Sequence, residues 1–334
     1  MKVFTISLLF LLWIVAAKAG AQDAKLVEAA KKEGGTVVIY GSLETPVMDA
    51  VMQAFRKKTG LDAQYWRASA MSVMNRAMTE YRSGKAGYDV VLNNSDPLLI
   101  MAQEGMIAKY DSPIARKYPK EQIDERLGPI TRYGIVGILY NKNRIKPEQA
   151  PRTLEDLVTP AYKDMLVMAD PRVHVTTIQW LSSLHKIMPK EKVDRFIRDL
   201  AATKPVLVES MLPAAERVST GEAAMAITFV KYAYTMAANG SPLDYVRLAK
   251  MLGDTHFAVL GGKAPHPDAG KAFIDFYLDD ESMKILAQNG EFANRKGIYP
   301  PLPGADKIQY VQLEILGAKA FEARKNELGR IFSN

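Results

Sequence analysis

Residues 36–69 read TVVIYGSLETPVMDAVMQAFRKKTGLDAQYWRAS, and this stretch decides the fold class. It opens with a short apolar run typical of a buried strand and continues into a helical segment. Thr45 is the expected N-cap of that helix, Pro46 takes the first helical position and Gly60 ends it. A second strand-like run follows at once. This alternation predicts a parallel sheet with right-handed crossovers, and therefore an α/β fold.

The same alternation continues toward the C-terminus in two units. Residues 70–96 add a helix and a third strand to the first unit. RYGIVGILYN (132–141) is a long extended stretch with two glycines, and further strands are expected at MLVMADP (165–171) and AAMAITFV (223–230). No Pro- or Ser-rich linker separates the two units. We therefore expect extended strands to pass directly from one unit to the other.

The N-terminus has the pattern of a secretory signal. Lys2 precedes an apolar run from Ile6 to Ala17, and the small residues Ala19, Gly20 and Ala21 follow. The run is shorter than the roughly 20 residues that a membrane-spanning helix needs. We expect residues 1–21 to be removed after Ala21 and the mature protein to be periplasmic.

Composition excludes several function classes. The chain has 334 residues, no cysteine and a formal net charge of +7, which becomes 7 − 2 = +5 without Lys2 and Lys18. This mild excess is spread along the chain, so no nucleic acid partner is expected. The absence of cysteine excludes disulfides, thiolate metal sites and a cysteine nucleophile. We find no GxSxG or Walker-type glycine loop and do not expect an enzyme.

Several segments together resemble a known family. They include LVEAAKKEGGTVVIYGS (26–42), YDVVLNNSDPLLIMAQEGMIAKYDSP (88–113) and STGEAAMAITFVKYAY (219–234). In this order they resemble the periplasmic solute-binding proteins of ABC importers, in the cluster grouped with ferric-iron-binding proteins. The resemblance implies a monomeric receptor that delivers a small molecule or ion to an ABC permease, and that meets the membrane only through this permease.

The resemblance also implies the type II periplasmic binding protein fold. Each of two lobes has a mixed, mainly parallel sheet flanked by helices, and the ligand lies in the cleft between them. We expect lobe 1 at 22–132 and 258–334, and lobe 2 at 133–257. Two crossovers near TRYGIVGIL and THFAVLG would act as the hinge for lobe closure, because their glycines let the backbone bend.

The candidate ligand-binding residues follow from the sheet. In open parallel sheets, ligands bind beyond the carboxyl ends of the strands, where loops lead into helix N-termini. Ser69 and Thr176 are also residue types that cap helices, and Arg67 can be an ordinary surface arginine. The candidates at these corners are Ser42, Glu44, Arg67, Ser69, Asn93, Asn94, Arg172, Thr176, Thr177 and Tyr232.

FVKYAYTMAANG (229–240) raises the question of a tyrosine pair. If a helix starts here and ends at Gly240, side chains two positions apart point about 200° away from each other. Only one phenol can then face the cleft. We expect Tyr232 to be the site residue and Tyr234 to pack elsewhere.

Ferric-binding relatives typically carry two adjacent tyrosines at this place and a carboxylate in the third loop. Here Ala233 interrupts the pair, Asn93 and Asn94 stand where the carboxylate is expected, and Glu44 is the acid that remains. Lys231 and Arg67 add positive potential, which favours an anion. The leading prediction is a receptor for a small polar or anionic solute, with no cofactor.

Three alternatives stay open. The first is a ferric receptor that uses Tyr232, Tyr234 and Glu44 as metal ligands together with a synergistic anion. The other two are an exported enzyme and a ligand-sensing partner of a signalling receptor.

Overall fold

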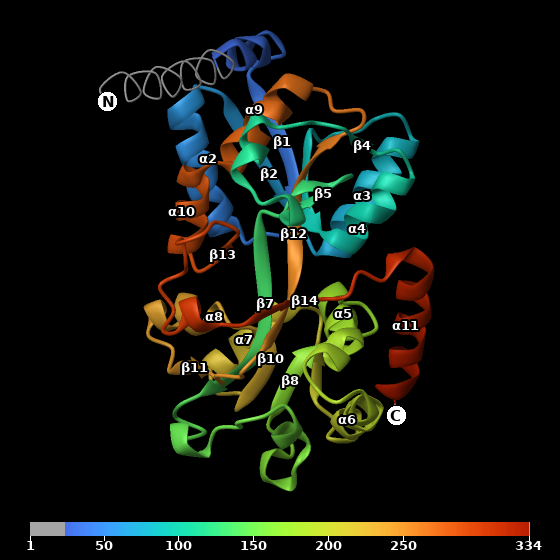
Figure 1. The fold of residues 1–334 in the computed structure, drawn as a ribbon, viewed down its shortest axis with the longest axis vertical. Coiled ribbons are helices and arrows are strands. Elements are labelled where there is room, and N and C mark those ends of the chain that lie inside the picture. The colour runs from blue at the N-terminus through green and yellow to red at the C-terminus, as the bar shows by residue number, and fades with distance from the viewer. Residues whose placement is uncertain (1–23, 334) are drawn as a thin grey trace, which may run out of the picture.

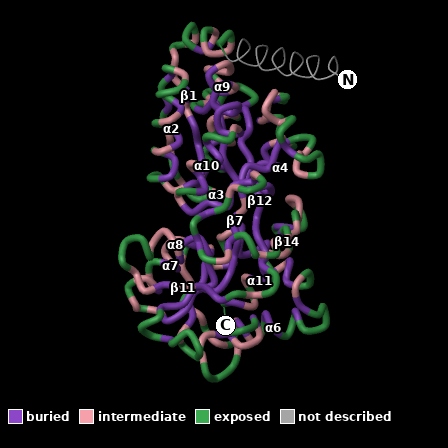
Figure 2. The backbone as a smooth tube through the Cα atoms, turned by 60° about the vertical axis from the view of Figure 1, so that its left-hand side comes forward, coloured by how far each residue is buried: buried purple, intermediate pink, exposed green. Residues whose placement is uncertain are grey.

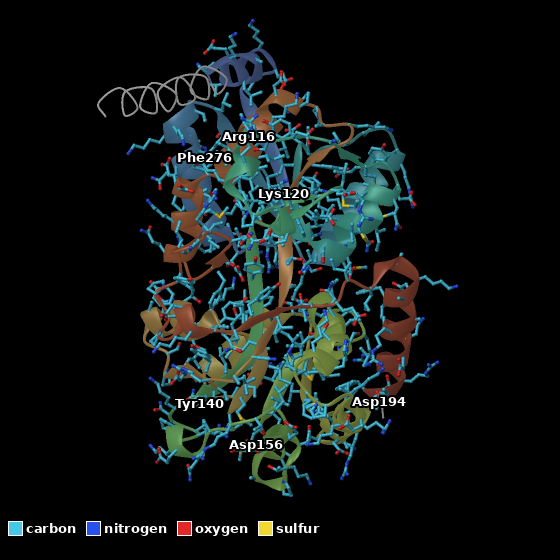
Figure 3. All side chains as sticks on the ribbon, in the orientation of Figure 1. Arg116, Lys120, Tyr140, Asp156, Asp194 and Phe276 are labelled. Carbon is cyan, nitrogen blue, oxygen red and sulfur yellow. The ribbon has the colours of Figure 1, made fainter. Side chains whose placement is uncertain are left out.

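The structure is a computed structural model that describes residues 24–333 (Figure 1). The expected secretory signal lies outside this part of the chain. Among the described residues, no helix is long and apolar enough to cross a membrane. Two lobes are stacked along the long axis, and side chains with nitrogen or oxygen ends are spread over both of them (Figure 3).

The first lobe contains the predicted parallel sheet. β1 (Thr36–Gly41) pairs in parallel with both β2 (Asp62–Arg67) and β3 (Val90–Asn94). α2 (Thr45–Thr59) and α3 (Ala70–Arg82) connect these strands, as the sequence predicts. Further helices of this lobe include α4 (Ser95–Gln103), α9 (Pro267–Leu278) and α10 (Asp280–Gln288).

The second lobe repeats this architecture with shorter strands. β8 (Leu166–Ala169) lies between β9 (Val206–Val208) and β10 (Met225–Phe229), and both pairings are parallel. Its helices are α5 (Val175–Ser183), α6 (Lys190–Ala202), α7 (Met211–Ser219) and the short α8 (Tyr232–Thr235). The minor strands of the molecule are β4 (Ile107–Ala108), β5 (Ile123–Asp124), β6 (Gly128–Pro129), β11 (Leu243–Tyr245) and β13 (Phe292–Ala293).

Two long strands join the lobes. β7 (Arg132–Asn141) and β12 (Met251–Gly261) run antiparallel and pair from Gly253↔Ile135 to His256↔Arg132. Beyond this pairing β12 joins β3 of the first lobe and β7 joins β10 of the second. Both strands are buried almost throughout (Figure 2). The predicted crossovers are therefore present, and the polar residues in them are enclosed by protein.

Glycines in and beside the crossovers allow close packing: Gly134 lies in the first expected hinge stretch, and Gly253 lies just before the second. Neither Gly134 nor Gly253 has a positive φ. A Cβ atom on Gly134 would lie 2.2 Å from Oδ1 of Asp254, and one on Gly253 would lie 2.8 Å from the ring of Tyr310. At both positions other groups pack directly on the backbone, which leaves no room for a larger side chain.

The C-terminal segment does not fit the expected lobe boundary. β14 (Tyr310–Gln312) pairs with the start of β12, and α11 (Gly317–Ile331) packs against α5 and α4. Leu313, Phe321 and Leu328 belong to the apolar core of the second lobe. The assignment of all of residues 258–334 to the first lobe is therefore wrong for this segment, because its apolar face is buried on the second lobe (Figure 1).

Candidate functional site

A small cavity lies between the lobes, where strands of both lobes end and helices begin. Its volume is about 60 Å³. The N-terminal ends of α3 and α5 contribute to its wall, which places partly positive backbone N–H groups around it. Its polar lining residues are Ser42, Glu44, Arg67, Ser69, Asn94, Arg132, His174, Thr176, Ser210, Lys231, Tyr232 and His256.

The two tyrosines of the 229–240 segment point to different places. α8 follows β10, and Gly240 ends the helical segment with φ +88°. The buried Tyr232 donates a hydrogen bond of 2.7 Å to Oε1 of Glu44. The hydroxyl of Tyr234 donates to the backbone carbonyl of Gln288 at 3.4 Å. The predicted helix is confirmed, and only Tyr232 lines this cavity.

Lys231 is a buried cation that lies between two carboxylates. Its Nζ donates to Oε2 of Glu44 at 2.6 Å and also to Glu291. Burial opposes the ammonium charge, but Glu291 and Glu44 outweigh it and raise the pKa of Lys231. Burial also opposes the Glu44 carboxylate, yet Lys231 and Tyr232 hold its pKa at about 2. Both groups are therefore charged at neutral pH.

Glu44 joins the lobes, because its backbone belongs to the first lobe and its side chain contacts the second. The helix α2 begins at Thr45, so Glu44 and not Thr45 is its N-cap. The Glu44 side chain makes no cap hydrogen bond to this helix. Instead, both of its oxygens accept hydrogen bonds from the second lobe, one from Tyr232 and one from Lys231.

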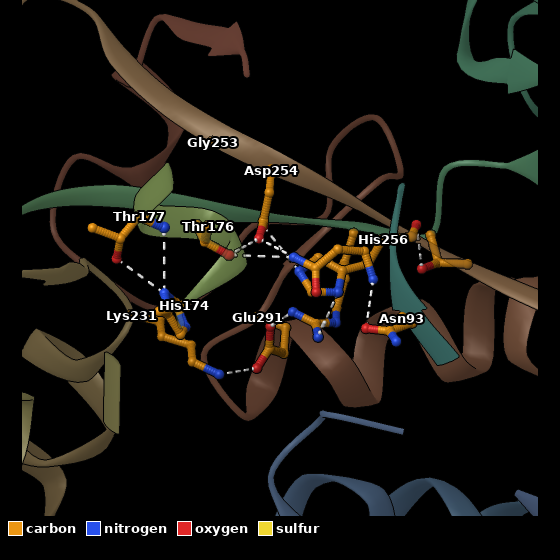
Figure 4. A network of polar contacts seen from close by, with 12 residues as sticks. Asn93, His174, Thr176, Thr177, Lys231, Gly253, Asp254, His256 and Glu291 are labelled. Atoms are coloured by element: carbon orange, nitrogen blue, oxygen red, sulfur yellow. Dashed lines mark hydrogen bonds and ion pairs between the residues drawn. The ribbon is translucent and has the colours of Figure 1, made fainter. Parts of the chain in front are cut away.

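A second part of the polar network lies on the crossover strands (Figure 4). Arg132 donates to Glu291 at 2.9 Å and contacts Nδ1 of His256 at 3.1 Å. A guanidinium has no acceptor, so Nδ1 must accept and Nε2–H must donate to Asp254, 2.9 Å away. Burial and then the charge of Arg132 lower the pKa of His256, which keeps its ring neutral.

Asp254 connects this network to both lobes. Its Oδ2 accepts hydrogen bonds from Thr176 at 2.6 Å and from Asn94. The amide of Asn94 also lies 3.3 Å from the Thr176 hydroxyl. Asn94 and Thr176 come from opposite lobes, so the cleft is bridged here as well as at Glu44.

Three predicted site residues are not at the cavity. Arg172 is exposed and forms a short ion pair of 2.6 Å with Asp170 in the same turn, next to α11, so its predicted cleft role is not supported. Asn93 is buried behind the wall and donates to the carbonyl of Ala70. Thr177 faces His174, 3.0 Å away.

The remaining predicted residues line the cavity with different local roles. Ser69 accepts a hydrogen bond from the backbone of Ser72, so it also caps α3. Ser42 follows β1. Arg67 is exposed, and no hydrogen bond or ion pair of its guanidinium is found within residues 24–333.

Sequence reasoning missed the charged residues of the crossovers. Arg132, Asp254 and His256 lie in long apolar runs that predict buried strands. A charge in such a run is a usable signal, because buried charges require partners. Glu291 carries no such signal, since it lies in the loop after α10.

The arrangement is poorly suited to a bare metal ion. Within the described chain, no group of three or more His, Asp or Glu side chains is arranged to hold one. Burial and the charge of Glu44 raise the pKa of Tyr232 well above its usual value, so its hydroxyl keeps its proton in the hydrogen bond to Glu44. The Lys231 ammonium beside it also repels cations.

Two α/β lobes, two crossing strands and a polar site between them define a two-lobe solute-binding protein. The chain belongs to the family of bacterial extracellular solute-binding proteins, whose family model matches residues 85–316. An uncharacterized protein of Haemophilus influenzae is 22% identical over 272 residues, which cover 77% of each chain.

Solved structures share the fold at low sequence identity. Iron-bound HitA from Pseudomonas aeruginosa has a TM-score of 0.74 and 20% identity, and the match covers 88% of this chain and 99% of HitA. AfuA from Actinobacillus pleuropneumoniae, with fructose-6-phosphate bound, has a TM-score of 0.73 and 19% identity, and the match covers 89% of this chain and 96% of AfuA. The substrate-binding protein of an Agrobacterium tumefaciens ABC transporter has a TM-score of 0.80 and 16% identity, and the match covers 89% of this chain and 94% of that protein.

Proposed function

We propose that this solute-binding protein is a periplasmic receptor for a small organic anion, which it delivers to an ABC permease as a monomer. Residues 1–21 would direct export and would be removed after Ala21. The ligand would lie in the cleft between the lobes and need no cofactor. The residues proposed to bind it are Ser42, Arg67, Ser69, Asn94, Thr176, Lys231 and Tyr232, and Glu44 lies among them in the cavity wall.

One observation carries this proposal. Lys231 and Tyr232 donate to the same carboxylate at the lobe interface, at 2.6 and 2.7 Å. Hydrogen bonds from a cation and a hydroxyl are suited to a carboxylate or a phosphate. Arg67 adds a guanidinium without a partner among the described residues, and the N-terminal ends of α3 and α5 add partial positive charge.

The relatives of known structure are consistent with two ligand classes. AfuA was solved with a sugar phosphate and HitA with iron. For this chain, the raised pKa of Tyr232 and the adjacent ammonium favour the anion. The ferric alternative would need Tyr232 and Tyr234 on one ion, whereas their hydroxyls contact different partners.

Titration with ferric citrate tests the choice between these classes. Phenolate bound to Fe(III) gives a visible charge-transfer band, so we expect the wild type to stay colourless. Tyr232→Phe and Tyr234→Phe are the matched variants. If a band appears in the wild type and either substitution removes it, the tyrosines form a metal site and the anion proposal is wrong.

A further inference from the structure

We infer that Glu44 is a built-in occupant of the anion site: its carboxylate takes the place of the ligand's anionic group, holds the empty receptor closed, and leaves when the ligand binds. This inference rests on the proposed function, because it assigns the ligand's acidic group to Lys231 and Tyr232. It gives Glu44 a role in selecting the ligand that differs from direct ligand binding.

The first argument is the origin of the contacts of Glu44. Its backbone follows β1 at the start of α2, yet its carboxylate makes no bond to that helix. Its two oxygens are divided between Tyr232 and Lys231 of the opposite lobe. To the second lobe, this carboxylate is therefore equivalent to a bound anion.

The second argument is space. The cavity of about 60 Å³ offers little room for an organic anion compared with the space beside it. A larger side cavity of about 610 Å³ lies next to it, and Glu44, Arg67, Lys231 and Tyr232 line both. Movement of the Glu44 side chain would thus open a path between the two.

The lining of the side cavity indicates the chemistry of the part of the ligand beyond its anionic group. Its wall contains Pro46, Leu212 and Met236 together with the ring of Tyr234, and the amides of Gln288 and Asn289 are at its edge. Such a mixed wall suits an organic group that has apolar and hydrogen-bonding parts. The ligand class is therefore an organic carboxylate or phosphate whose anionic end replaces Glu44.

The third argument is charge balance after Glu44 leaves. Lys231 keeps its contact with Glu291, which Arg132 also holds, so the departure leaves no buried ammonium without a partner. With Glu44 present, three cations (Lys231, Arg132, Arg67) face three carboxylates (Glu44, Glu291, Asp254). Without Glu44 one positive charge is in excess, which an incoming anion neutralises.

The test compares Glu44→Gln and Glu44→Ala with the wild type, all purified without ligand by unfolding and refolding. Small-angle X-ray scattering measures the radius of gyration of each. Calorimetry then measures the affinity for three probes: inorganic phosphate, citrate and fructose 6-phosphate. The control is Glu104→Gln, which removes an exposed pair with Arg82 inside the first lobe.

We expect both Glu44 variants to have a larger radius of gyration than the wild type and the control, and to bind at least one organic probe about tenfold more tightly. A radius equal to that of the control, or weaker binding of every probe that the wild type binds, would overturn the inference. If the radius increases but no anion binds any of the proteins, Glu44 closes the receptor and the proposed ligand class is wrong.

If instead an anion binds the wild type and Tyr232→Phe weakens it, the proposed function stands. The inference about Glu44 then fails on its own if its variants change neither the radius nor the affinity.

Discussion

Lys231 is the residue on which the site depends most. It is 6% exposed and lies between Glu44 and Glu291, which come from the opposite lobe. A charge this deeply buried is stable only because both carboxylates solvate it. This ammonium group is thus fixed in position by the residues around it.

Replacing this lysine is expected to destabilise the fold. In Lys231→Met, Glu291 keeps Arg132 but loses Lys231, and Glu44 loses the one ion-pair partner found for it within residues 24–333. Removing one member of a buried ion pair costs about 3–5 kcal/mol. Urea unfolding should show a loss of this size, whereas the exposed Lys319→Met should stay within about 0.5 kcal/mol of the wild type. Equal stabilities of the two variants would contradict the assigned role of Lys231.

At this scale the sequence predicts local geometry but not distant partners. The divergence of Tyr232 and Tyr234 follows from the helix alone, since it depends on the angle between adjacent positions. The contact between Glu44 and Lys231 joins residues 187 positions apart, and no local pattern encodes it. Arg172 is a different case, because its ion pair is with Asp170 only two positions away, and the sequence reasoning overlooked this local partner.

The crossover strands are the elements that position the site. β7 and β12 carry Arg132, Asp254 and His256 through the middle of the molecule, and they are held close together because Gly134 has no side chain. Asp254 occupies the space that a side chain at position 134 would need. The packing of these two strands therefore fixes the Asp254 carboxylate that Thr176 and Asn94 share.

Gly134→Ala tests this packing. The added methyl group would meet Oδ1 of Asp254 at 2.2 Å and the ring of Phe229 at 2.8 Å, so the strands must separate. Overpacking of this kind costs about 1–3 kcal/mol, which a fall in the thermal midpoint would report. In α11, Gly329→Ala meets its nearest atom at 3.7 Å and should be neutral or stabilising. A neutral Gly134→Ala would contradict the close approach of Asp254.

Elements with a strong local pattern could be predicted, and their packing partners could not. The strands and helices of residues 36–94 follow from apolar runs, Pro46 and Gly60. The apolar face of α11 shows only that it packs on something. The placement of α11 on the second lobe depends on the pairing of β14 with the start of β12. This pairing joins residues about 60 positions apart.

At the scale of the whole molecule, polar contacts bridge the cleft between the lobes, as the inference about Glu44 requires. Glu44 with Lys231 and Asn94 with Thr176 both bridge the cleft, and Gln179 donates to Asp96 across it at 2.7 Å. The two-lobe fold could be predicted from the sequence because family motifs extend along the chain. The ligand could not, because neighbours with this fold were solved with different ligands.

The central claim is that the cleft binds a small organic anion through Lys231 and Tyr232. Native mass spectrometry of the protein released from its own periplasm tests it most directly. We predict an adduct with the mass of an organic carboxylate or phosphate. Once that adduct is identified, Tyr232→Phe should weaken its binding about tenfold, because a charge-assisted hydrogen bond contributes roughly 1.5–3 kcal/mol. The control variant Tyr234→Phe should change the binding little. An adduct with the mass of a ferric ion, lost in Tyr232→Phe, would contradict the account.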